Sequence, residues 1–250
     1  MKKNIIITGA SSGLGKEMAL KFAKNKANLL LIARNKTRLD EVVILATKYG
    51  AKVISEICDV FEKDKLKQII LDFNNDYPVD LIIANAGVSA GTSQGSESLE
   101  QFHNILNINI YGVINTIHPL ITKFKDNKSG QIALISSMAA LHALPSAPAY
   151  SCSKICVKYY GDALRAELKK YNIKVNVIFP GYIKTAMTEK NNFPMPLLMN
   201  CDKAANKIIR GLEKNQPYII FPKIMYFLIK LLNVMPLYLQ DKIFANLPKK

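Results

Sequence analysis

A tyrosine and a lysine one helical turn apart are the first residues whose types and spacing could do chemistry. Tyr150 and Lys154 open a stretch of helical character that we expect to run to about Tyr171. Residues four apart share a face of a helix, so an ammonium would lie beside a phenol. A neighbouring cation lowers the pKa of a phenol from its ordinary value near ~10 toward the range of acid–base catalysis. The alternative is an ordinary exposed pair on a helix surface.

A glycine-rich turn near the N-terminus has the composition of a dinucleotide site. The run Asn4–Thr8 predicts a strand buried on both faces, and a helical stretch to about Asn25 follows the turn. Between them lies the pattern T-G-x-x-x-G-x-G, which differs from the common G-x-G-x-x-G. Glycines let the backbone approach a pyrophosphate closely, and the helix N-terminus offers it N–H groups, although such a turn can be purely structural. We expect cofactor contacts from Gly9, Ser11, Ser12, Gly13, Leu14 and Gly15.

The end of the second predicted strand, Asn28–Ala33, indicates which nicotinamide cofactor would bind. An NAD enzyme usually has a carboxylate here for the ribose 2′-hydroxyl. This chain instead has Arg34, Asn35 and Lys36. A guanidinium can bind a 2′-phosphate, so the sequence favours NADP(H) over NAD(H), unless Arg34 is an ordinary charge beside a helix. Asp59, after the predicted strand Lys52–Ile57, could contact the adenine amino group or cap the next helix.

Strands and helices alternate along the chain. Further helices are expected over Thr37–Tyr49, Glu62–Asn74, Leu99–Phe124 and Asp202–Asn215, and further strands over Pro78–Ala84, Gly130–Ser136, Ile173–Phe179 and Pro217–Phe221. The alternation predicts an α/β fold of Rossmann type, with a doubly wound, mostly parallel seven-stranded sheet and helices on both faces. Ligands bind beyond the carboxyl ends of such strands, so Ser137, Tyr150 and the glycine-rich turn should converge there. We expect one domain over residues 1–221 and an apolar helical extension over residues 222–250.

Charge and cysteine content limit the other classes of protein. The 250 residues carry a net charge of +15, which attracts anionic ligands, membrane surfaces or nucleic acid. The lysines are scattered and no nucleic-acid-binding motif occurs, so nucleic-acid binding is not expected. The four cysteines form neither a CxxC pair nor a disulfide framework, which favours buried free thiols and no metal site. The chain has no signal-peptide pattern, so a cytoplasmic location is expected.

Short motifs in a fixed order give the chain a family resemblance over roughly Asn4–Phe221. It resembles the short-chain dehydrogenase/reductase family. The matching motifs are Thr8-Gly9-x-x-x-Gly13-x-Gly15, Asn85-Ala86-Gly87, Asn109-x-x-Gly112, Ser137, Tyr150-x-x-x-Lys154 and Pro180-Gly181-x-x-x-Thr185. The separation of 13 residues between Ser137 and Tyr150 is also the one that the family shows. Ala84 departs from the pattern, because the family usually has an asparagine there that helps to brace the cofactor turn; slightly looser packing is therefore expected.

The resemblance implies a role for each matching residue. Tyr150 would donate the proton in reduction and accept it in oxidation, while Lys154 would lower the pKa of Tyr150 and hold the nicotinamide ribose. Ser137 would bind the substrate oxygen, and Asn109 would position a water that relays protons. Further cofactor contacts are expected from Val60, Asn85, Ala86, Gly87, Pro180, Gly181, Ile183 and Thr185, besides Tyr150, Lys154, Arg34 and Asp59. A homodimer or homotetramer through the Leu99 and Tyr150 helices is also implied.

The predicted reaction is hydride transfer between a nicotinamide and a carbonyl compound or secondary alcohol. Residues Ala186–Asn200 match the family's variable substrate-covering region, and their apolar members favour a hydrophobic substrate: Phe193, Met195, Leu197, Leu198 and Met199. The alternative is that these side chains pack on the domain itself. Two other functions stay open, an NADP-sensing protein and a membrane-peripheral binding protein, each with little turnover. The sequence names neither the substrate nor the physiological direction.

The tail after Pro222 is unusually apolar. Lys223, Lys230 and Pro236 interrupt it, so it cannot provide the ~20 continuous apolar residues that span a bilayer. It could lie on an anionic membrane surface, peripheral to the inner membrane, with lysines at the interface: Lys223, Lys230, Lys242, Lys249 and Lys250. It could instead cover the substrate pocket or pack in a subunit contact. The sequence favours packing, because a membrane-surface helix usually has a longer cationic face.

Overall fold

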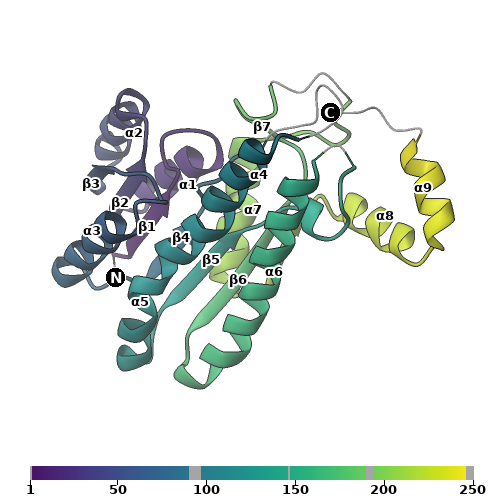
Figure 1. Ribbon diagram of the computed structural model, residues 1–250. Helices are drawn as coiled ribbons and strands as arrows, with labels where there is room; N and C mark the ends of the chain where they lie inside the picture. Colours follow the sequence, from purple (N-terminus) through teal and green to yellow (C-terminus); the bar gives the residue numbers. More distant parts are fainter. Residues whose placement is uncertain (1, 90–96, 146, 190–193, 246–250) are drawn as a thin grey trace.

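Seven strands form a parallel sheet through the centre of the protein (Figure 1). The computed structural model describes residues 2–89, 97–145, 147–189 and 194–245. The strand order is β3-β2-β1-β4-β5-β6-β9, and the printed pairings in this sheet are all parallel. The strands are β1 (Asn4–Thr8), β2 (Asn28–Ala33), β3 (Lys52–Ile57), β4 (Leu81–Ala84), β5 (Gln131–Ile135), β6 (Lys174–Pro180) and β9 (Tyr218–Phe221). The predicted doubly wound α/β fold is thus confirmed, and the described strands of this sheet are parallel throughout.

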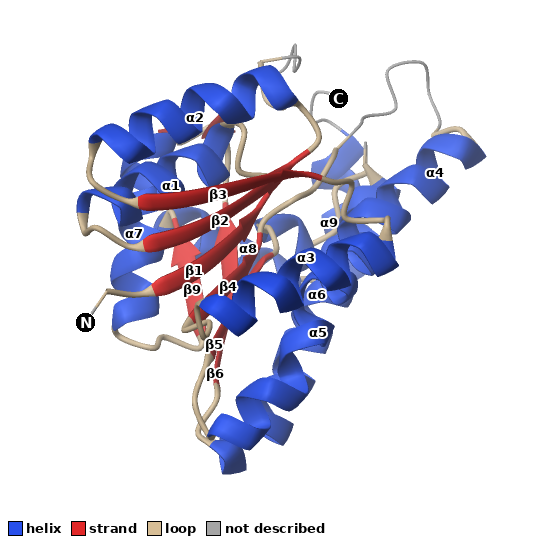
Figure 2. Cartoon of the chain, turned by 90° about the vertical axis from the view of Figure 1, so that its left-hand side faces the viewer, coloured by secondary structure: helices blue, strands red, loops and turns tan. Residues whose placement is uncertain are grey.

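Helices cover both faces of the sheet (Figure 2). One layer consists of α1 (Gly13–Lys24), α2 (Lys36–Lys48) and α7 (Cys201–Glu213), and the other of α3 (Lys63–Asp76), α5 (Gly112–Asn127) and α6 (Pro148–Leu168). The shorter helices are α4 (Leu99–Leu106), α8 (Lys223–Asn233) and α9 (Leu237–Ala245). The sheet order reverses between β1 and β4, which is where doubly wound sheets bind their ligands.

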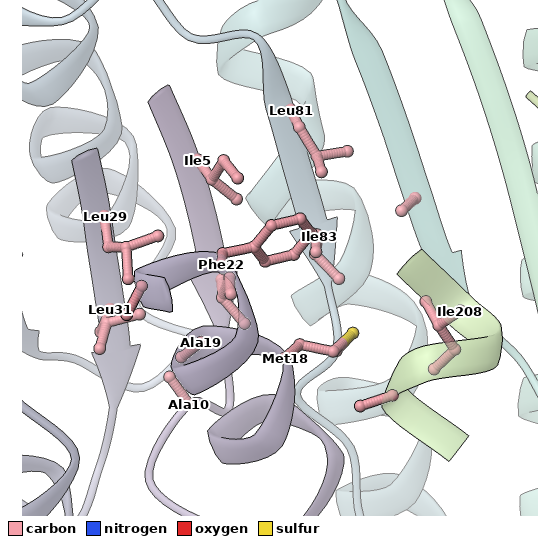
Figure 3. Packing of buried hydrophobic residues seen from close by; sticks show 14 of the residues in the cluster. Ile5, Ala10, Met18, Ala19, Phe22, Leu29, Leu31, Leu81, Ile83 and Ile208 are labelled. Carbon is pink, nitrogen blue, oxygen red and sulfur yellow. The ribbon is translucent and has the colours of Figure 1, made fainter. Parts of the chain in front are cut away.

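The core follows from the unbroken apolar runs of the strands. Successive side chains of a strand point to opposite faces, so Ile5 and Ile7 meet one helix layer and Ile6 meets the other. Figure 3 shows Met18, Ala19 and Phe22 of α1 lying over Ile5, Leu29, Leu31 and Ile83 of three strands. These side chains are almost completely buried. The two-sided burial fixes the sheet and therefore the edge at which its carboxyl ends meet.

Some elements differ from the sequence expectation. The stretch expected as one helix from Leu99 contains a π-helical turn at Asn107–Tyr111 between α4 and α5. Helix α6 begins at Pro148, because proline with its fixed φ is favoured in the first turn. A second, small parallel sheet joins β7 (Ile183–Lys184) to β8 (Met199–Asn200) and was not predicted. The expectation of buried thiols is correct for Cys58 but wrong for Cys152, which is exposed on α6, and for Cys156 and Cys201, which are half-buried.

The tail packs on the domain through one face only. Met225, Tyr226 and Ile229 of α8 lie on a cluster that includes Met138 and Phe179. The favoured expectation, packing over the substrate pocket or in a subunit contact, stays a prediction, because this inner face packs on the domain itself. No helix among the described residues is long and apolar enough to cross a membrane. Some sequence expectations concern positions outside the described residues: Phe193 of the covering region, Lys249 and Lys250.

Candidate active site

A cavity of about 610 Å³ opens at the carboxyl edge of the sheet. Its volume is typical of cofactor and small-molecule sites. The turns after six strands line it, and the predicted site residues in its wall are Gly9, Ser11, Ser12, Gly13, Leu14, Arg34, Asp59, Val60, Asn85, Ala86, Gly87, Ser137, Tyr150, Lys154, Pro180, Gly181, Ile183 and Thr185. Gly15 and Asn109 are predicted site residues that do not line it. Further wall residues, which no motif indicated, include Asn35, Arg38, Ile108, Met187 and Thr188.

The glycine-rich turn has the shape that a bound dinucleotide requires. Gly9 and Gly13 have φ of +66° and +55°, a conformation that L side chains rarely adopt. A Cβ at Gly15 would overlap the carbonyl oxygen of Gly9, so this position admits only glycine although it lies behind the cavity wall. Ser12, the N-cap of α1, makes no side-chain capping bond to any described residue. The N–H groups at the start of α1 are therefore suited to an anion such as a pyrophosphate.

Asn85 holds this turn in place from the end of β4. Its Nδ2 donates to the carbonyl oxygens of Thr8 at 2.9 Å and Gly9 at 3.2 Å. The hydroxyl of Thr8 accepts from the backbone N–H groups of Asn85 and Ala86 at 3.2 and 3.3 Å. The looser packing expected from Ala84 does not extend to these contacts, because Asn85 braces the turn and Ala84 itself is buried.

Two arginines, Arg34 and Arg38, line the cavity at the end of β2. The guanidinium of Arg34 donates to a carboxylate oxygen of Asp59 at 3.2 Å, and its side chain is 61% exposed. The other oxygen of Asp59 accepts from the N–H of Phe61 at 3.0 Å. Asp59 therefore stabilises the turn before α3, while the N-cap of that helix is Glu62. Sequence analysis missed Arg38. Arg38 lies in the first turn of α2, shortly after Arg34 and the N-cap Asn35, and this closeness in the sequence was the available signal.

Ser137, Tyr150 and Lys154 form a polar cluster in the wall of the same cavity. Ser137 follows β5, while Tyr150 and Lys154 lie in the first two turns of α6. The Ser137 side chain is hydrogen-bonded to the Tyr150 phenol. The ammonium of Lys154 donates to the carbonyl oxygen of Ile135 at 3.0 Å and lies 5.5 Å from the Tyr150 ring centroid. Ser136 donates from its hydroxyl to the backbone oxygen of Lys154 at 2.8 Å, which fixes α6 against β5.

The protonation of this cluster differs from the sequence expectation. Burial raises the pKa of the Tyr150 phenol above its ordinary value of 10.0, and the hydrogen bond from Ser137 offsets only part of that rise. Burial also lowers the pKa of the Lys154 ammonium from 10.5 to about 8. The pKa of Tyr150 in the protein alone is therefore shifted opposite to the expected direction, because loss of solvent outweighs the hydrogen bond from Ser137, and a lowering by Lys154 stays a prediction. The phenol keeps its proton at neutral pH.

Asn109 is fully buried in the π-helical turn. Its Oδ1 accepts from the N–H of Val88 at 2.8 Å, and its Nδ2 donates to the oxygen of Val88 at 2.9 Å and to Ser153 Oγ at 3.0 Å. Both side-chain N–H groups are thus engaged by the protein. The side chain joins the loop after β4 to α6, so a water of the predicted relay would be held by an oxygen of Asn109 or by other residues rather than by the side-chain N–H groups.

Glu97, which sequence analysis missed, holds the start of α6 in place. One of its carboxylate oxygens accepts from the N–H of Ala149 at 2.8 Å. A negative charge at the N-terminus of a helix stabilises that end, which here is the first turn of α6, directly before Tyr150. The bond joins residues 52 positions apart, so no local pattern could have indicated it.

Known proteins resemble this chain over most of its length. A model of the short chain dehydrogenase family matches residues 3–195. The 11-beta-hydroxysteroid dehydrogenase-like 2 of Arabidopsis thaliana is 31% identical over 255 residues, which cover 98% of this chain and 82% of the relative. A short chain dehydrogenase from Mycobacterium paratuberculosis, solved bound to NAD, is 25% identical with a TM-score of 0.75 and covers 83% of this chain and 89% of its own. One from Sphingobium yanoikuyae, solved with NADPH, shares the fold with a TM-score of 0.81 at 22% identity, over 94% and 96%.

Proposed function

The chain belongs to the short-chain dehydrogenase/reductase family, and we propose that it is an NADP(H)-dependent carbonyl reductase acting on a hydrophobic ketone or aldehyde. The cluster of Ser137, Tyr150 and Lys154 in a cavity with a glycine-rich cradle carries this proposal. When bound, the nicotinamide supplies or accepts the hydride. The protein's own residues would bind the substrate oxygen, exchange its proton and orient both reactants.

Each residue of the cluster has a separate task in this mechanism. Ser137, already hydrogen-bonded to the phenol, would donate to the substrate oxygen. Tyr150 would pass its hydroxyl proton to that oxygen as negative charge develops there. The Lys154 ammonium would donate to the ribose hydroxyls of the nicotinamide side and stabilise the phenolate that remains. Gly87 leaves room for these groups, since a Cβ there would lie 3.1 Å from Asn109 Oδ1 and 3.5 Å from Lys154 Nζ.

The raised pKa of Tyr150 supports the reductive direction. A phenol whose pKa lies above 10.0 carries its proton throughout the neutral range, and reduction requires that proton to be donated. Oxidation requires the phenolate, which burial disfavours. The proposal therefore expects carbonyl reduction to be faster than alcohol oxidation at neutral pH.

Arg34 and Arg38 support NADP(H) rather than NAD(H). Two guanidinium groups line the cavity at the end of β2, and charge-assisted bonds to a phosphate are each worth ~1.5–3 kcal/mol. Titrating NADPH and NADH into wild type, Arg34→Ala and Arg38→Ala, with the cofactor's own fluorescence as readout, tests this. Each variant should lose roughly 10–100-fold in affinity for NADPH and little for NADH.

Lys36→Ala is the matched control for this titration. Lys36 lies between the two arginines, but its ammonium is paired with Asp40 at 2.7 Å and it does not line the cavity. Its replacement should leave both affinities nearly unchanged. Equal binding of NADH and NADPH by wild type would reject the preference for NADPH. The proposal of a nicotinamide cofactor would still stand.

The wall near β7 supports a hydrophobic substrate. Ile183 and Met187 line the cavity, and Leu197 and Leu198 of the covering region remain 47% and 43% exposed instead of packing on the domain. The Arabidopsis relative bears a hydroxysteroid dehydrogenase-like name, which agrees with an apolar substrate. Specificity constants for straight-chain aldehydes should rise with length by up to about fourfold per methylene. A flat series would reject the hydrophobic substrate but not the reductase.

We also propose a homo-oligomer built on α4 and α6. Leu99, Ile155 and Tyr159 expose 72%, 37% and 63% of their surface on these helices. Exposed apolar side chains on adjacent helices favour association with a second copy. Tyr159→Asp should shift the mass measured by light scattering toward the monomer, and an unchanged mass would exclude this face. We also keep the division of the chain expected from sequence: residues 1–221 would form the catalytic domain and residues 222–250 an extension of it.

A further inference from the structure

Helix α8 has two apolar faces, and only one of them is covered by described residues. The inner face, Met225, Tyr226 and Ile229, packs on the domain. On the opposite side Ile224 and Phe227 each expose 63% of their surface, Leu228 60% and Leu231 57%. Positions 224, 227, 228 and 231 share one side of a helix, so these four side chains form a stripe.

The stripe continues around the turn into α9. Val234 is 78% exposed, and beyond Pro236 Leu237 and Tyr238 are 74% and 69% exposed. We call the set Ile224, Phe227, Leu228, Leu231, Val234, Leu237 and Tyr238 the outer apolar face. Figure 1 shows both helices projecting at the side of the molecule, with the turn between them at its outer margin. Monomeric proteins seldom expose an apolar surface of this extent without a partner.

The charges around this face distinguish its occupants. Residues 222–250 contain five lysines and one aspartate, and the whole chain carries +15. Lys223 and Lys230 lie one heptad apart on the border between the two faces of α8. A second copy docked symmetrically on the same face would bring like charges together, and α4 and α6 already offer it a separate apolar surface. An anionic bilayer matches both the apolar residues and the lysines.

We propose that the outer apolar face docks the protein on the surface of an anionic lipid bilayer. The apolar side chains enter the boundary between headgroups and acyl chains, and the flanking ammonium groups bind the headgroup phosphates. The contact is peripheral, because neither helix is long enough to cross the membrane among the described residues.

Docking at this face would bring the bilayer close to the catalytic cavity. A side chain at Gly181 would touch Pro222 and Met225, so the start of α8 lies directly on a turn that lines the cavity. The end of α8 is tied to the segment after Ser137, since Asn233 Nδ2 donates to the Leu141 oxygen at 2.9 Å and Asn233 Oδ1 lies 2.6 Å from His142 Nδ1. A membrane-dissolved carbonyl compound is therefore the substrate class that suits this arrangement, a point that depends on the proposed function.

Vesicle flotation with the full chain tests the docking. Wild type should float with vesicles of phosphatidylcholine mixed with phosphatidylglycerol, and much less with phosphatidylcholine alone. The double variant Phe227→Gln, Leu231→Gln should bind at least about tenfold more weakly, because it removes two apolar contacts. Ile44→Gln is the matched control: Ile44 is 57% exposed on α2, as Leu231 is on α8, and its replacement should leave flotation unchanged.

The lysines provide a second, independent readout. Lys223→Gln and Lys230→Gln should each weaken binding to the anionic vesicles about fivefold at low salt and less at high salt. No flotation of wild type, or equal flotation of the double variant, would overturn the proposal. So would a double variant that changes the mass of the oligomer in solution, since the face would then be a contact between copies. NADPH binding measured on the same samples separates failure of docking from failure of the reductase proposal.

Discussion

Replacing Lys154 with methionine should stabilise the cofactor-free protein while it abolishes turnover. The side chain is buried in the cavity wall, and burial lowers the pKa of its ammonium from 10.5 to about 8. A difference of this size corresponds to about 3 kcal/mol spent on keeping the buried group charged. Methionine removes that cost but also the bond that the ammonium makes to the Ile135 oxygen, and a hydrogen bond to a charged group is worth ~1.5–3 kcal/mol. The net gain is about 1 kcal/mol at pH 7.

The gain should depend on pH with a defined sign. Between pH 8 and 10.5 the unfolded chain binds a proton at residue 154 that the folded protein has lost, so the stability of wild type rises with pH in this window. The advantage of methionine is therefore full below pH 8 and disappears as the pH approaches 10.5. NADPH should also reduce it, because the ammonium gains ligand contacts in the complex.

Thermal unfolding of both proteins across this pH range measures the effect. For a chain of this length, about 1 kcal/mol raises Tm by about 2–4 °C. The control is Lys158→Met, one turn further along α6. Burial acts to lower the pKa of Lys158, but its hydrogen bond to Asp162 at 3.0 Å and the charge of that carboxylate raise it overall. That variant should gain no stability. A fall in Tm for Lys154→Met at pH 7, or a gain independent of pH, would refute the reasoning.

Three further substitutions test the site. Ser137→Ala should lower turnover by ~10²–10³ and move the acidic limb of the pH profile of alcohol oxidation, where the rate rises as the phenol loses its proton, to higher pH, since the Ser137 bond lowers the pKa of Tyr150; an unchanged pH profile would contradict this. Gly87→Ala should lower turnover about tenfold by crowding Asn109 and Lys154, with circular dichroism unchanged; full activity would show that the cavity has room there. Asn85→Ala should cost ~1–3 kcal/mol in denaturant unfolding and weaken NADPH binding, because the glycine turn loses its two braces; an unaltered midpoint would exclude that role.

The features that could be predicted from sequence are those that local patterns determine. The bounds expected for Asn4–Thr8, Asn28–Ala33 and Lys52–Ile57 agree with the structure residue for residue. Asn4–Thr8 and Asn28–Ala33 are short apolar runs buried on both faces of the sheet, and this signal is strong, whereas Lys52–Ile57 is a half-buried edge strand with polar residues. The spacing of glycines, and of Tyr150 and Lys154, is equally local. The cavity lined by these residues lies at the sheet edge where the alternation of strands and helices indicated it.

The features that could not be predicted depend on residues far apart in the chain. The pairing of Arg34 with Asp59 and the three hydrogen bonds of Asn109 have no signature in the neighbouring sequence. The raised pKa of Tyr150 results from burial by the folded chain, whereas the sequence displayed only the nearby cation. Strands as short as β7 and β8 have no periodicity to detect, and their pairing joins Ile183 to Met199. Which side of α8 is exposed could likewise not be predicted, because it depends on which side packs on the distant residues of the domain.

The central claim is that Tyr150 is the proton donor of a nicotinamide-dependent carbonyl reductase. The most direct test follows NADPH consumption with a series of hydrophobic aldehydes and ketones, by wild type and by Tyr150→Phe, and measures NADPH binding by both. We expect wild type to turn over and the variant to bind NADPH with similar affinity while its turnover falls by ~10²–10⁴. Equal turnover by both proteins would contradict the role of Tyr150. NADPH binding without turnover of any carbonyl compound or alcohol by wild type would contradict the reductase and favour a protein that senses the cofactor.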